Sequence, residues 1–390
     1  MNKLNIGLFV DTYYPMVDGV VMVVDNYAKR LSKWANVYVF APTIPKKTND
    51  DSKYNYKIIR CKSLDVPFLD YALPLPDIDK EFKKKVEECN LDIVHIHSPV
   101  TIGNVGLKYA KKHNIPVVAT MHSQYKQDFM RATKSKIITK KLTNHIVKFF
   151  EKCDECWTLN KDVAKVLTED YGYTKQPILI NNATEMKPIE NIDQSNDLLN
   201  KKYNIIDEKV LLFVGRINKL KNIDLIVKSL SHVKKIKYKM FIIGTGQDEE
   251  YLEKLIKKHK LENNVLMIGK ITDREELARY YARADLFIFP SMYDTNSLVQ
   301  IEAASQNTPT LFLKGAATAS SITADVNGYI GEFDEVKFAR KIEEILLDEE
   351  KLKQVSINAH KDIYKQWDEE VERIYNQYKD LINRKNKKDI

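Results

Sequence analysis

The chain has few cysteines and no long apolar run, and both absences restrict what it can be. The apolar start, 4–10, ends at Asp11, and no later run approaches the roughly 20 apolar residues of a membrane span. We therefore expect neither a signal peptide nor a membrane span, and a cytoplasmic protein whose 4 cysteines are reduced thiols. Cys153 and Cys156 form an isolated CxxC pair, which lacks the four ligands of a structural zinc site. We expect no metal.

Short repeats and low-complexity segments are also missing, and an alternation of two kinds of segment runs through the 390 residues. Short β-branched runs alternate with amphipathic helical stretches such as 20–34, 224–233 and 298–305, which is typical of parallel sheets covered on both faces. The predicted strands are 4–10, 37–41, 57–60, 92–96, 116–121, 156–159, 177–180, 210–214, 239–243, 265–268, 286–289 and 310–313.

This length and pattern predict an α/β protein with two Rossmann-like, doubly wound parallel-sheet domains that face a cleft. We place the N-terminal domain at 1–190 and the C-terminal domain at 201–365. The polar segment 186–200 is interpreted as the linker. A helical tail, 366–390 within the apolar-periodic stretch 363–390, is expected to pack back on the N-terminal domain.

The unusual residues of the chain follow the predicted strands. Ligands of doubly wound sheets bind beyond the carboxyl ends of the strands, so these residues are candidates for a site. They are Asp11 and Gly19 after the first strand, His97 after the fourth, His122 after the fifth, and Gly215–Arg216, 244–246, 269–270 and 290–297 in the second half.

Each of these signals has a plain alternative when it is taken alone. The turn 244–246 (GTG) could be a tight turn instead of a phosphate loop. His95 and His97 lie on one side of a strand but lack a third metal ligand. His122 could be a core histidine, and Asp11 could cap the turn that follows it.

The sharpest pattern is Asp294 followed by Glu302 in YDTNSLVQIEAASQNTP. A diphosphate on the N-terminus of the helix that begins near Ser297 would accept from backbone N–H groups of Ser297, Leu298 and Val299. Glu302 could accept from ribose hydroxyls and Asp294 from sugar hydroxyls. Arg216 and Lys221 add fixed positive charge for a leaving diphosphate. A capping acid and a solvated acid remain the alternative for the two carboxylates.

With these motifs, nearly the whole chain resembles the retaining glycosyltransferases of family 4, which have the two-domain GT-B fold. The matching elements are DTYYPMVDGV (11–20), VHIHSP (94–99), ATMHSQY (119–125), LINNATE (179–185), FVGRINKLKN (213–222), IIGTGQDEEYLEKL (242–255), YYARADLFIFPSMYDTNSLVQIEAA (280–304) and NGY (327–329). The sequence departs from the family at Asp294, which is usually Glu, at Ser297, which is commonly Gly, and at 181–185.

The resemblance implies roles for individual residues. Asp294 and Glu302 correspond to the family's pair of acids, and His122 to the histidine that contacts the transferred sugar. Arg216 and Lys221 correspond to the basic pair on the donor diphosphate, and Gly19 to the glycine beside it. The loop Gly269, Lys270 and Ile271 would hold the base. The family implies a nucleotide-sugar donor, retention of anomeric configuration and no metal or other cofactor. We expect a UDP-sugar, and a GDP- or ADP-sugar remains the alternative.

The acceptor is suggested by a basic strip. Segment 126–152 has eight Lys and Arg against two acids, although the whole chain carries only +8. As a helix, 131–150 places Ile138, Leu142, Ile146, Phe149 and Phe150 near one side among lysines, which is the composition of an interfacial helix on anionic lipid. The predicted membrane contacts are Arg131, Lys134, Lys136, Lys140, Lys141 and Lys148.

The first loop also resembles that of enzymes that glycosylate diacylglycerol, so we expect a lipid acceptor and a peripheral location on the inner face of the membrane. An ordinary helix with solvated lysines remains the alternative. So do a capsule, cell-wall or soluble glycan acceptor, and a nucleotide-sugar epimerase or silent sugar-nucleotide binder. Nucleic acid is disfavoured as a partner because the aromatics of the strip are not interleaved with its basic residues as base-stacking platforms.

Overall fold

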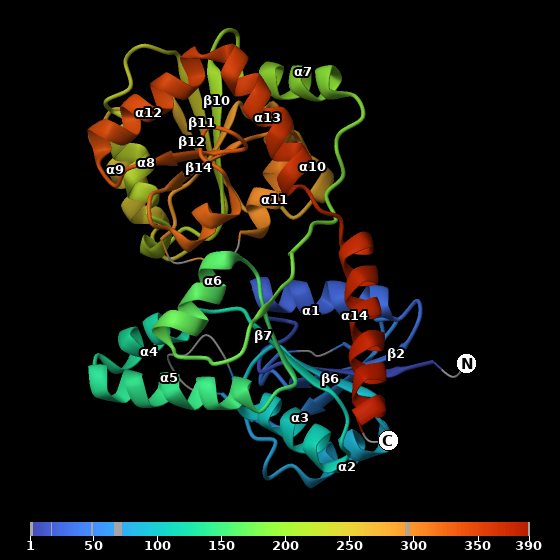
Figure 1. Cartoon of the computed structure of the whole chain (residues 1–390). Helices are drawn as coiled ribbons and strands as arrows, with labels where there is room; N and C mark the ends of the chain where they lie inside the picture. Colours follow the sequence, from blue (N-terminus) through green and yellow to red (C-terminus); the bar gives the residue numbers. More distant parts are fainter. Residues whose placement is uncertain are drawn as a thin grey trace. The chain divides into compact units, whose positions relative to one another are not determined.

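The computed structural model describes residues 3–16, 18–47, 50–65, 72–292, 294 and 297–388, with the backbone alone at residue 388 (Figure 1). The chain divides into two compact units. Unit 1 comprises Met1–Asn182 and Trp367–Ile390, and unit 2 comprises Ala183–Gln366. Each unit is a parallel sheet covered by helices on both faces, which confirms the predicted fold class.

The sheet of unit 1 has the order β3-β2-β1-β6-β7-β8-β9. Its strands are β1 (Asn5–Phe9), β2 (Asn36–Pro42), β3 (Lys57–Cys61), β6 (Ile93–Ile96), β7 (Val117–Met121), β8 (Glu155–Thr158) and β9 (Ile178–Leu179). The direction of the strand order reverses between β1 and β6, and doubly wound sheets bind ligands at such a switch point. A separate antiparallel pair is formed by β4 (Ser63–Leu64) and β5 (Leu73–Pro74).

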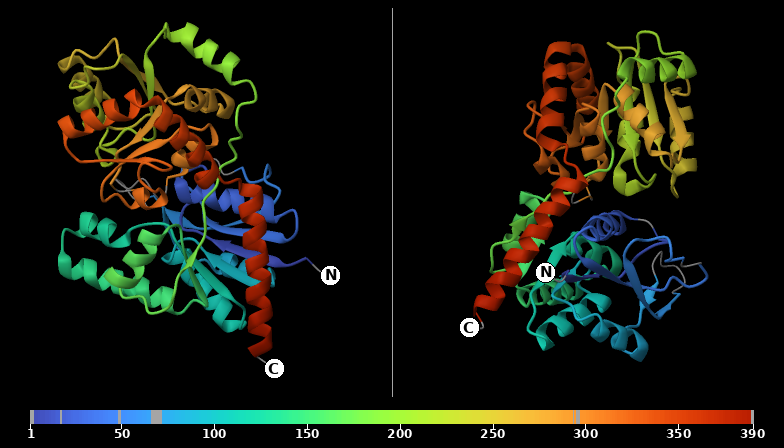
Figure 2. Two further views of the ribbon diagram at one scale, coloured as in Figure 1. Left: turned by 45° about the horizontal axis from the view of Figure 1, so that its top comes forward. Right: turned by 90° about the vertical axis from the view of Figure 1, so that its right-hand side faces the viewer.

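The helices of unit 1 surround this sheet, and all of them except α4 bury apolar residues in its core. They are α1 (Gly19–Leu31), α2 (Lys80–Glu88), α3 (Thr101–Lys112), α4 (Tyr125–Thr133), α5 (Lys136–Glu151), α6 (Lys161–Lys165) with the π-turn η1 (Val166–Asp170), and α14 (Trp367–Lys388). Figure 2 shows α14 running along the rest of unit 1. Tyr375 of α14 stacks on Trp34 with ring centroids 5.4 Å apart, and Asp368 pairs with Arg30 of α1 at 3.0 Å.

The sheet of unit 2 has the order β12-β11-β10-β13-β14-β15, with its switch point between β10 and β13. Its strands are β10 (Lys209–Val214), β11 (Tyr238–Ile243), β12 (Val265–Gly269), β13 (Leu286–Phe289), β14 (Thr310–Leu313) and β15 (Tyr329–Gly331). Its helices are α7 (Ile192–Tyr203), α8 (Ile223–Leu230), α9 (Glu249–Lys258), α10 (Arg274–Arg283), α11 (Leu298–Ser305), α12 (Glu335–Leu347) and α13 (Glu349–Ile363), with 3₁₀ turns η2 (Lys219–Lys221) and η3 (Ala317–Ser321).

Several predicted elements differ from those observed. The segment 186–200, interpreted as a linker, contains most of helix α7, because the Asn191 side chain caps the helix at Gln194 N and Leu199 is buried. The helical tail begins at Trp367, after a break at Tyr364. The strands β4, β5, β9 and β15 have two or three residues each, and of these only β9 was predicted. In the part of the chain described, no helix is both long and apolar enough to span a membrane.

Candidate functional site

In unit 2, an ion pair joins the loops that follow β10 and β13, on either side of the switch point. Lys221 Nζ lies 2.7 and 2.6 Å from the two carboxylate oxygens of Asp294, and both side chains are largely buried. The same ammonium lies 5.3 Å from the ring centroid of Phe289, at the end of β13. Two predicted site residues from different loops are therefore in direct contact.

Hydrogen bonds to the backbone fasten the same two loops. Asn222 adopts the left-handed conformation, and its Nδ2 donates to Pro290 O at 2.9 Å. Arg216 extends from the first loop to the surface and forms no salt bridge with any residue that the structure describes. Of the two predicted cations, Lys221 is thus neutralised by Asp294 and Arg216 is exposed.

The glycines of the turn 244–246 are required by packing. Gly244 has φ +137°, and a Cβ there would lie 1.9 Å from Gly215 O. A Cβ on Gly246 would lie 2.0 Å from Ile217 O. Because backbone meets backbone at both positions, these residues bring the loops after β10 and β11 together, which favours the tight-turn reading.

Helix α11 begins at Leu298, shortly after Asp294 in the sequence, and positions Glu302. Ser297 is its N-cap, and its Oγ accepts from Gln300 N at 3.3 Å. The half-buried Leu298 and Val299 form the first turn, at the positive end of the helix dipole. The three residues predicted to meet a diphosphate are therefore consecutive at one helix N-terminus.

Both carboxylate oxygens of Glu302 have partners on the neighbouring helix α10. Arg274 NH2 lies 2.5 Å from Oε1, and the Tyr281 hydroxyl donates to Oε2 at 3.1 Å. Burial raises the pKa of Tyr281, which keeps that hydroxyl a donor. Glu302 is only 8% exposed, so the alternative of a solvated acid is wrong. Sequence reasoning missed Arg274 and Tyr281, since nothing in their spacing links them to Glu302.

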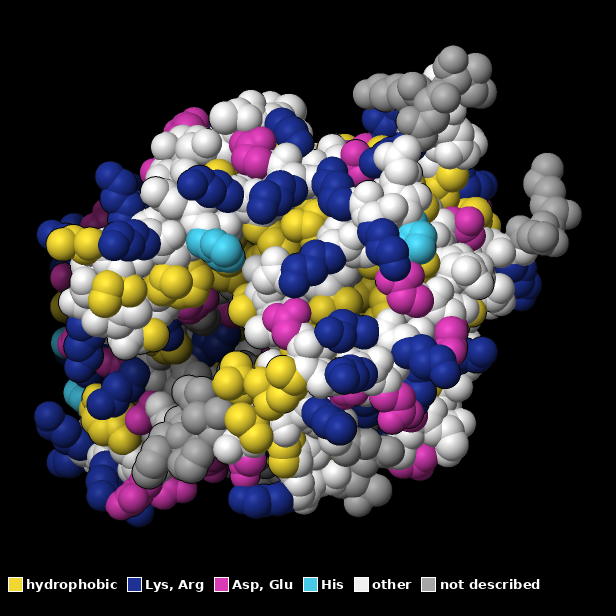
Figure 3. Space-filling model, turned by 90° about the horizontal axis from the view of Figure 1, so that it is seen from below, with side chains coloured by type: hydrophobic (Ala, Val, Ile, Leu, Met, Phe, Trp, Pro, Cys, Tyr) yellow, Lys and Arg dark blue, Asp and Glu magenta, His cyan; other side chains and the backbone are white. Residues whose placement is uncertain are grey.

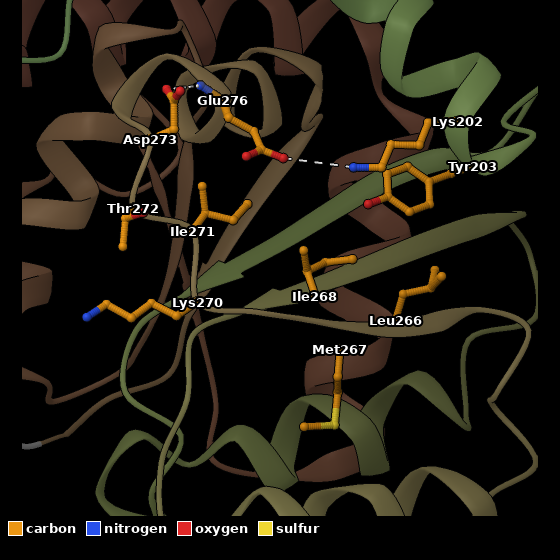
Figure 4. A pocket seen from close by; sticks show the side chains of 10 residues that line it. All are labelled: Lys202, Tyr203, Leu266, Met267, Ile268, Lys270, Ile271, Thr272, Asp273 and Glu276. Carbon is orange, nitrogen blue, oxygen red and sulfur yellow. Dashed lines mark hydrogen bonds and ion pairs between the residues drawn. The ribbon is translucent and has the colours of Figure 1, made fainter.

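The loop after β12 lies beside a surface cavity. Gly269 has φ +82°, which favours glycine, and its carbonyl accepts from Gly244 N at 2.9 Å. Lys270 and Ile271 line a cavity of about 540 Å³ together with residues of α7, β12 and the start of α10 (Figure 4). Figure 4 shows Lys202 of α7 directed at Glu276, 3.8 Å away, with Lys270 extending in another direction.

In unit 1, the predicted residues follow the adjacent strands β1, β6 and β7. Asp11 Oδ1 accepts from the backbone N–H of Thr101 at 3.1 Å and of Ile102 at 2.8 Å, at the start of α3. Asp11 therefore caps a distant helix and not the turn that follows it, and burial raises its pKa. Gly19 is the first residue of α1, and a Cβ there would meet nothing within 4 Å.

His122 is buried beside two other histidines. His97 Nδ1 lies 3.0 Å from His122 Nε2, and the rings of His95 and His97 are 4.0 Å apart. His95 itself bonds to Tyr378 of α14 at 2.5 Å and to Thr120 at 2.7 Å. Burial lowers the pKa of His122 to about 4, so the imidazole is neutral at pH 7.

The basic strip is not one helix. Lys134 adopts the left-handed conformation and separates α4 from α5, and Arg131 lies in the last turn of α4. Ile146, Phe149 and Phe150 are buried in the core of unit 1, so they do not form a surface with Ile138 and Leu142. The exposed apolar residues are instead Ile137, Ile138 and Leu142, and Lys136, Lys140, Lys141 and Lys148 lie on the same helix.

The four cysteines are free and buried. Burial raises the pKa of Cys153 to about 12, and that of Cys156 rises as well. Within the described ranges, no group of three or more His, Cys, Asp or Glu could hold a metal ion. Because both thiols of the CxxC pair are buried, they are core thiols.

Comparison with known proteins places these features in a family. The model of Glycosyltransferase Family 4 matches residues 17–184, and that of Glycosyl transferases group 1 matches residues 195–362. An alpha-monoglucosyldiacylglycerol synthase of Acholeplasma laidlawii is 31% identical over 78% of this chain and 79% of its own length. One from Streptococcus pneumoniae is 28% identical over 85% of this chain and 76% of its own.

Among solved structures, the Anabaena protein HepE in complex with UDP aligns with a TM-score of 0.78 at 14% identity, over 97% of this chain and 100% of that one. A second structure of that protein is in complex with UDP-glucose. The chain belongs to glycosyltransferase family 4, as its motifs predicted, and it is a glycosyltransferase with the GT-B fold.

Proposed function

We propose that this enzyme transfers a hexose from a UDP-sugar to a hydroxyl of a membrane lipid such as diacylglycerol, with retention of configuration and without a metal. The observation that carries the proposal is the edge of unit 2, where Arg216, Lys221, the N-terminus of α11 and Glu302 follow strands on either side of the switch point. The UDP and UDP-glucose of the Anabaena structures support this donor.

The donor diphosphate is assigned to the two cations and to the helix N-terminus. Asp294 neutralises Lys221, while Arg216 is exposed. A diphosphate that reaches this edge would share Lys221 with Asp294 and accept from the first turn of α11, at Ser297, Leu298 and Val299. These charges supply the electrostatic stabilisation that other transferases obtain from a divalent ion.

The ribose is assigned to Glu302 and the base to the loop Gly269, Lys270 and Ile271. Arg274 and Tyr281 occupy one lone pair on each oxygen of Glu302, and a carboxylate has about four acceptor sites. The remaining sites can accept from two hydroxyls. Gly19 beside the diphosphate and His122 beside the sugar complete the assignment from unit 1.

Retention of configuration is what the family resemblance implies, and the state of the acids bears on the route by which it is achieved. Asp294 is bound through both oxygens to Lys221, and Glu302 is bound through both to α10. Neither carboxylate is free to attack an anomeric carbon. We therefore propose that the acceptor hydroxyl attacks on the face that the diphosphate leaves, with positioning and electrostatics as the protein's contributions.

The lipid acceptor is supported by α5 and by the names of the two synthases. The face seen in Figure 3 carries hydrophobic side chains among Lys and Arg. Ile137, at 72% exposure, Ile138 and Leu142 lie on α5, whose lysines suit an anionic bilayer. We propose a peripheral location on the inner face of the membrane.

A donor and acceptor screen tests the function. UDP-, GDP- and ADP-hexoses are incubated with the protein, with and without vesicles of diacylglycerol and phosphatidylglycerol, and glycolipid and free nucleotide are measured. We expect glycolipid from a UDP-hexose, and an unchanged anomeric configuration by NMR of the product. Transfer to a soluble glycan without vesicles would replace the lipid acceptor, and interconversion of donors without transfer would point to an epimerase.

A further inference from the structure

The contact between His97 and His122 determines where the protons of both rings lie. His97 follows β6 and His122 follows β7, and His97 Nδ1 and His122 Nε2 are 3.0 Å apart. The backbone N–H of His97 donates to Phe9 O at 2.8 Å, which fixes its place at the end of the strand. Burial lowers the pKa of both histidines, so both rings are neutral at pH 7 and only one of the two facing nitrogens carries a proton.

The other nitrogen of His97 distinguishes the two arrangements. His97 Nε2 is buried and has no hydrogen-bond partner among the residues described. If Nε2 carried the proton, a buried N–H would be unpaired, which is rarer in proteins than a buried acceptor with a spare lone pair. The arrangement that avoids this puts the proton of His97 on Nδ1, which donates to His122 Nε2. His122 then carries its own proton on Nδ1.

The surroundings of His97 leave this bond undisturbed by charge. The ring centroid of His97 lies 4.0 Å from that of His95 of β6, 5.5 Å from that of Tyr27 of α1 and 5.2 Å from that of His122. Burial lowers the pKa of His95 and raises that of Tyr27, so these neighbours are neutral at pH 7. His97 therefore acts on His122 through a neutral hydrogen bond.

We propose that His97 is a positioning residue for sugar transfer, and that its Nδ1–H fixes the ring orientation of His122 and fixes His122 as the Nδ1–H tautomer. The hydrogen bond that one ring nitrogen makes sets the role of the other, so His122 offers a donor, not an acceptor, at Nδ1. This inference rests on the proposed role of His122 beside the transferred sugar. A ring with a mixed tautomer would offer that donor for only part of the time.

The tautomer is tested without any measurement of activity. Two-bond ¹H–¹⁵N spectra of the full-length protein with ¹⁵N-labelled histidine are recorded at pH 7, with the His122 signal assigned by its loss in His122→Ala. We expect His122 as the Nδ1–H tautomer in the wild type, and a changed tautomer ratio in His97→Phe. An Nε2–H tautomer in the wild type, or an unchanged ratio in His97→Phe, would overturn the proposal.

The effect on turnover is tested with a double-mutant cycle in the enzyme with its donor and acceptor. We expect His122→Ala to lower kcat by about 100-fold, as for loss of one transition-state donor, and His97→Phe by about tenfold. The double variant should match His122→Ala, and His97→Asn, whose amide places an N–H near the position of Nδ1, should recover most of the rate. Folding of each variant is checked by tryptophan fluorescence.

The outcomes separate the two proposals. Wild-type kcat in His122→Ala would refute the role assigned to His122, while the spectra would still decide the tautomer. Two results would overturn the positioning role of His97 alone, provided that His122→Ala has a lowered kcat. One is a wild-type kcat in His97→Phe, and the other is a double variant in which the two losses of kcat multiply.

Discussion

Glu302 accepts from Arg274 and Tyr281, which begin and nearly end helix α10, and this contact controls the orientation of its carboxylate. A carboxylate that is bound on both oxygens loses little further freedom when it accepts from a ligand. Arg274 and Tyr281 are separated from Glu302 by 28 and 21 residues along the chain, so only the fold brings them to it.

Substitution of Glu302 and its partners should weaken donor use in a graded way. We expect Glu302→Gln to lower kcat/KM for the donor by about 100-fold or more, and Arg274→Ala by about tenfold, since a charge-assisted hydrogen bond contributes about 1.5–3 kcal/mol. Arg279→Ala is the matched control, because the ion pair that Arg279 forms within the described ranges is with the exposed Glu275 on the same helix. Steady-state kinetics with varied donor measures all three. A wild-type kcat/KM for Glu302→Gln would show that Glu302 is not part of the donor site.

The buried histidines make the stability of unit 1 depend on pH. Burial lowers the pKa of His122 to about 4, whereas an unfolded histidine titrates near 6.5. The neutral, buried His122 therefore stabilises the folded state fully above about pH 6.5. This contribution is lost as the pH falls from 6.5 toward 4, because in that range only the unfolded chain takes up the proton. Between pH 8 and pH 5 this residue alone should lower the free energy of unfolding by about 2 kcal/mol. The pKa values of His95 and His97 are lowered too, so they act in the same direction.

Urea unfolding followed by tryptophan fluorescence measures this effect, since the 3 tryptophans, Trp34, Trp157 and Trp367, all belong to unit 1. His122→Phe should show a smaller change between the two pH values than the wild type. Equal changes in the two proteins would mean that His122 titrates normally in the folded state.

At the scale of elements, α5 is the helix that we propose contacts a membrane. Its buried side supports the core through Ile146, Phe149 and Phe150, and its exposed residues include lysines and three apolar side chains. Because the residues that would contact anionic lipid are not those that pack in the core, such binding would leave unit 1 folded.

Charge reversal on α5 should abolish membrane binding. Replacing Lys136, Lys140 and Lys141 by Glu should reduce partition onto phosphatidylglycerol vesicles by about 100-fold or more, because each basic residue near such a surface contributes about 1 kcal/mol. The control replaces Lys257, Lys258 and Lys260 by Glu at the end of α9, with the same change in net charge. Co-sedimentation at low and high salt measures both. Equal loss in the two variants would indicate a general charge effect.

The second element is α14, which packs on unit 1 although it lies at the end of the chain. Tyr378 is fully buried, stacks on Trp157 with centroids 5.7 Å apart, and bonds to His95. The helix thereby completes the core under the histidines.

Removal of the Tyr378 hydroxyl should destabilise unit 1. We expect Tyr378→Phe to lower the free energy of unfolding by about 1–3 kcal/mol, because it leaves His95 Nδ1 buried without its partner. Tyr375→Phe, which keeps the stacking on Trp34, should change it little. Urea unfolding monitored by tryptophan fluorescence compares the two. Equal stabilities would show that the hydroxyl contributes nothing.

At the scale of the whole molecule, the charge that would meet a diphosphate comes from side chains and a helix end. Arg216 and Lys221 follow β10, and α11 begins after β13, so strands on both sides of the switch point contribute. This arrangement leads to a prediction about metals.

Chelation should leave transfer unchanged. We expect the same kcat with excess EDTA as with added Mg²⁺, because fixed cations neutralise the leaving group in place of a divalent ion. Arg216→Ala should instead lower kcat/KM for the donor by about 100-fold in either buffer, as expected for loss of one preorganised donor to the leaving group. Steady-state assays in the two buffers decide the matter. A strict requirement for the ion would contradict the proposed mechanism.

The sequence by itself determined the alternation of strands and helices, the family, the segments after the strands in which Arg216, Lys221 and Asp294 lie, and the helix that carries Glu302. These features could be predicted because periodicity and short motifs depend on residues that are close together in the sequence. Local periodicity failed where burial decides: α7 in the predicted linker, the break at Lys134, and the short strands β4, β5 and β15.

Only the tertiary structure decided which side chains meet. The pairs Lys221–Asp294 and His97–His122 join residues 73 and 25 positions apart, and Asp11 caps a helix about 90 residues away. Partners at such separations come together because parallel strands end at one edge of a sheet, and the order of the strands is a property of the whole fold.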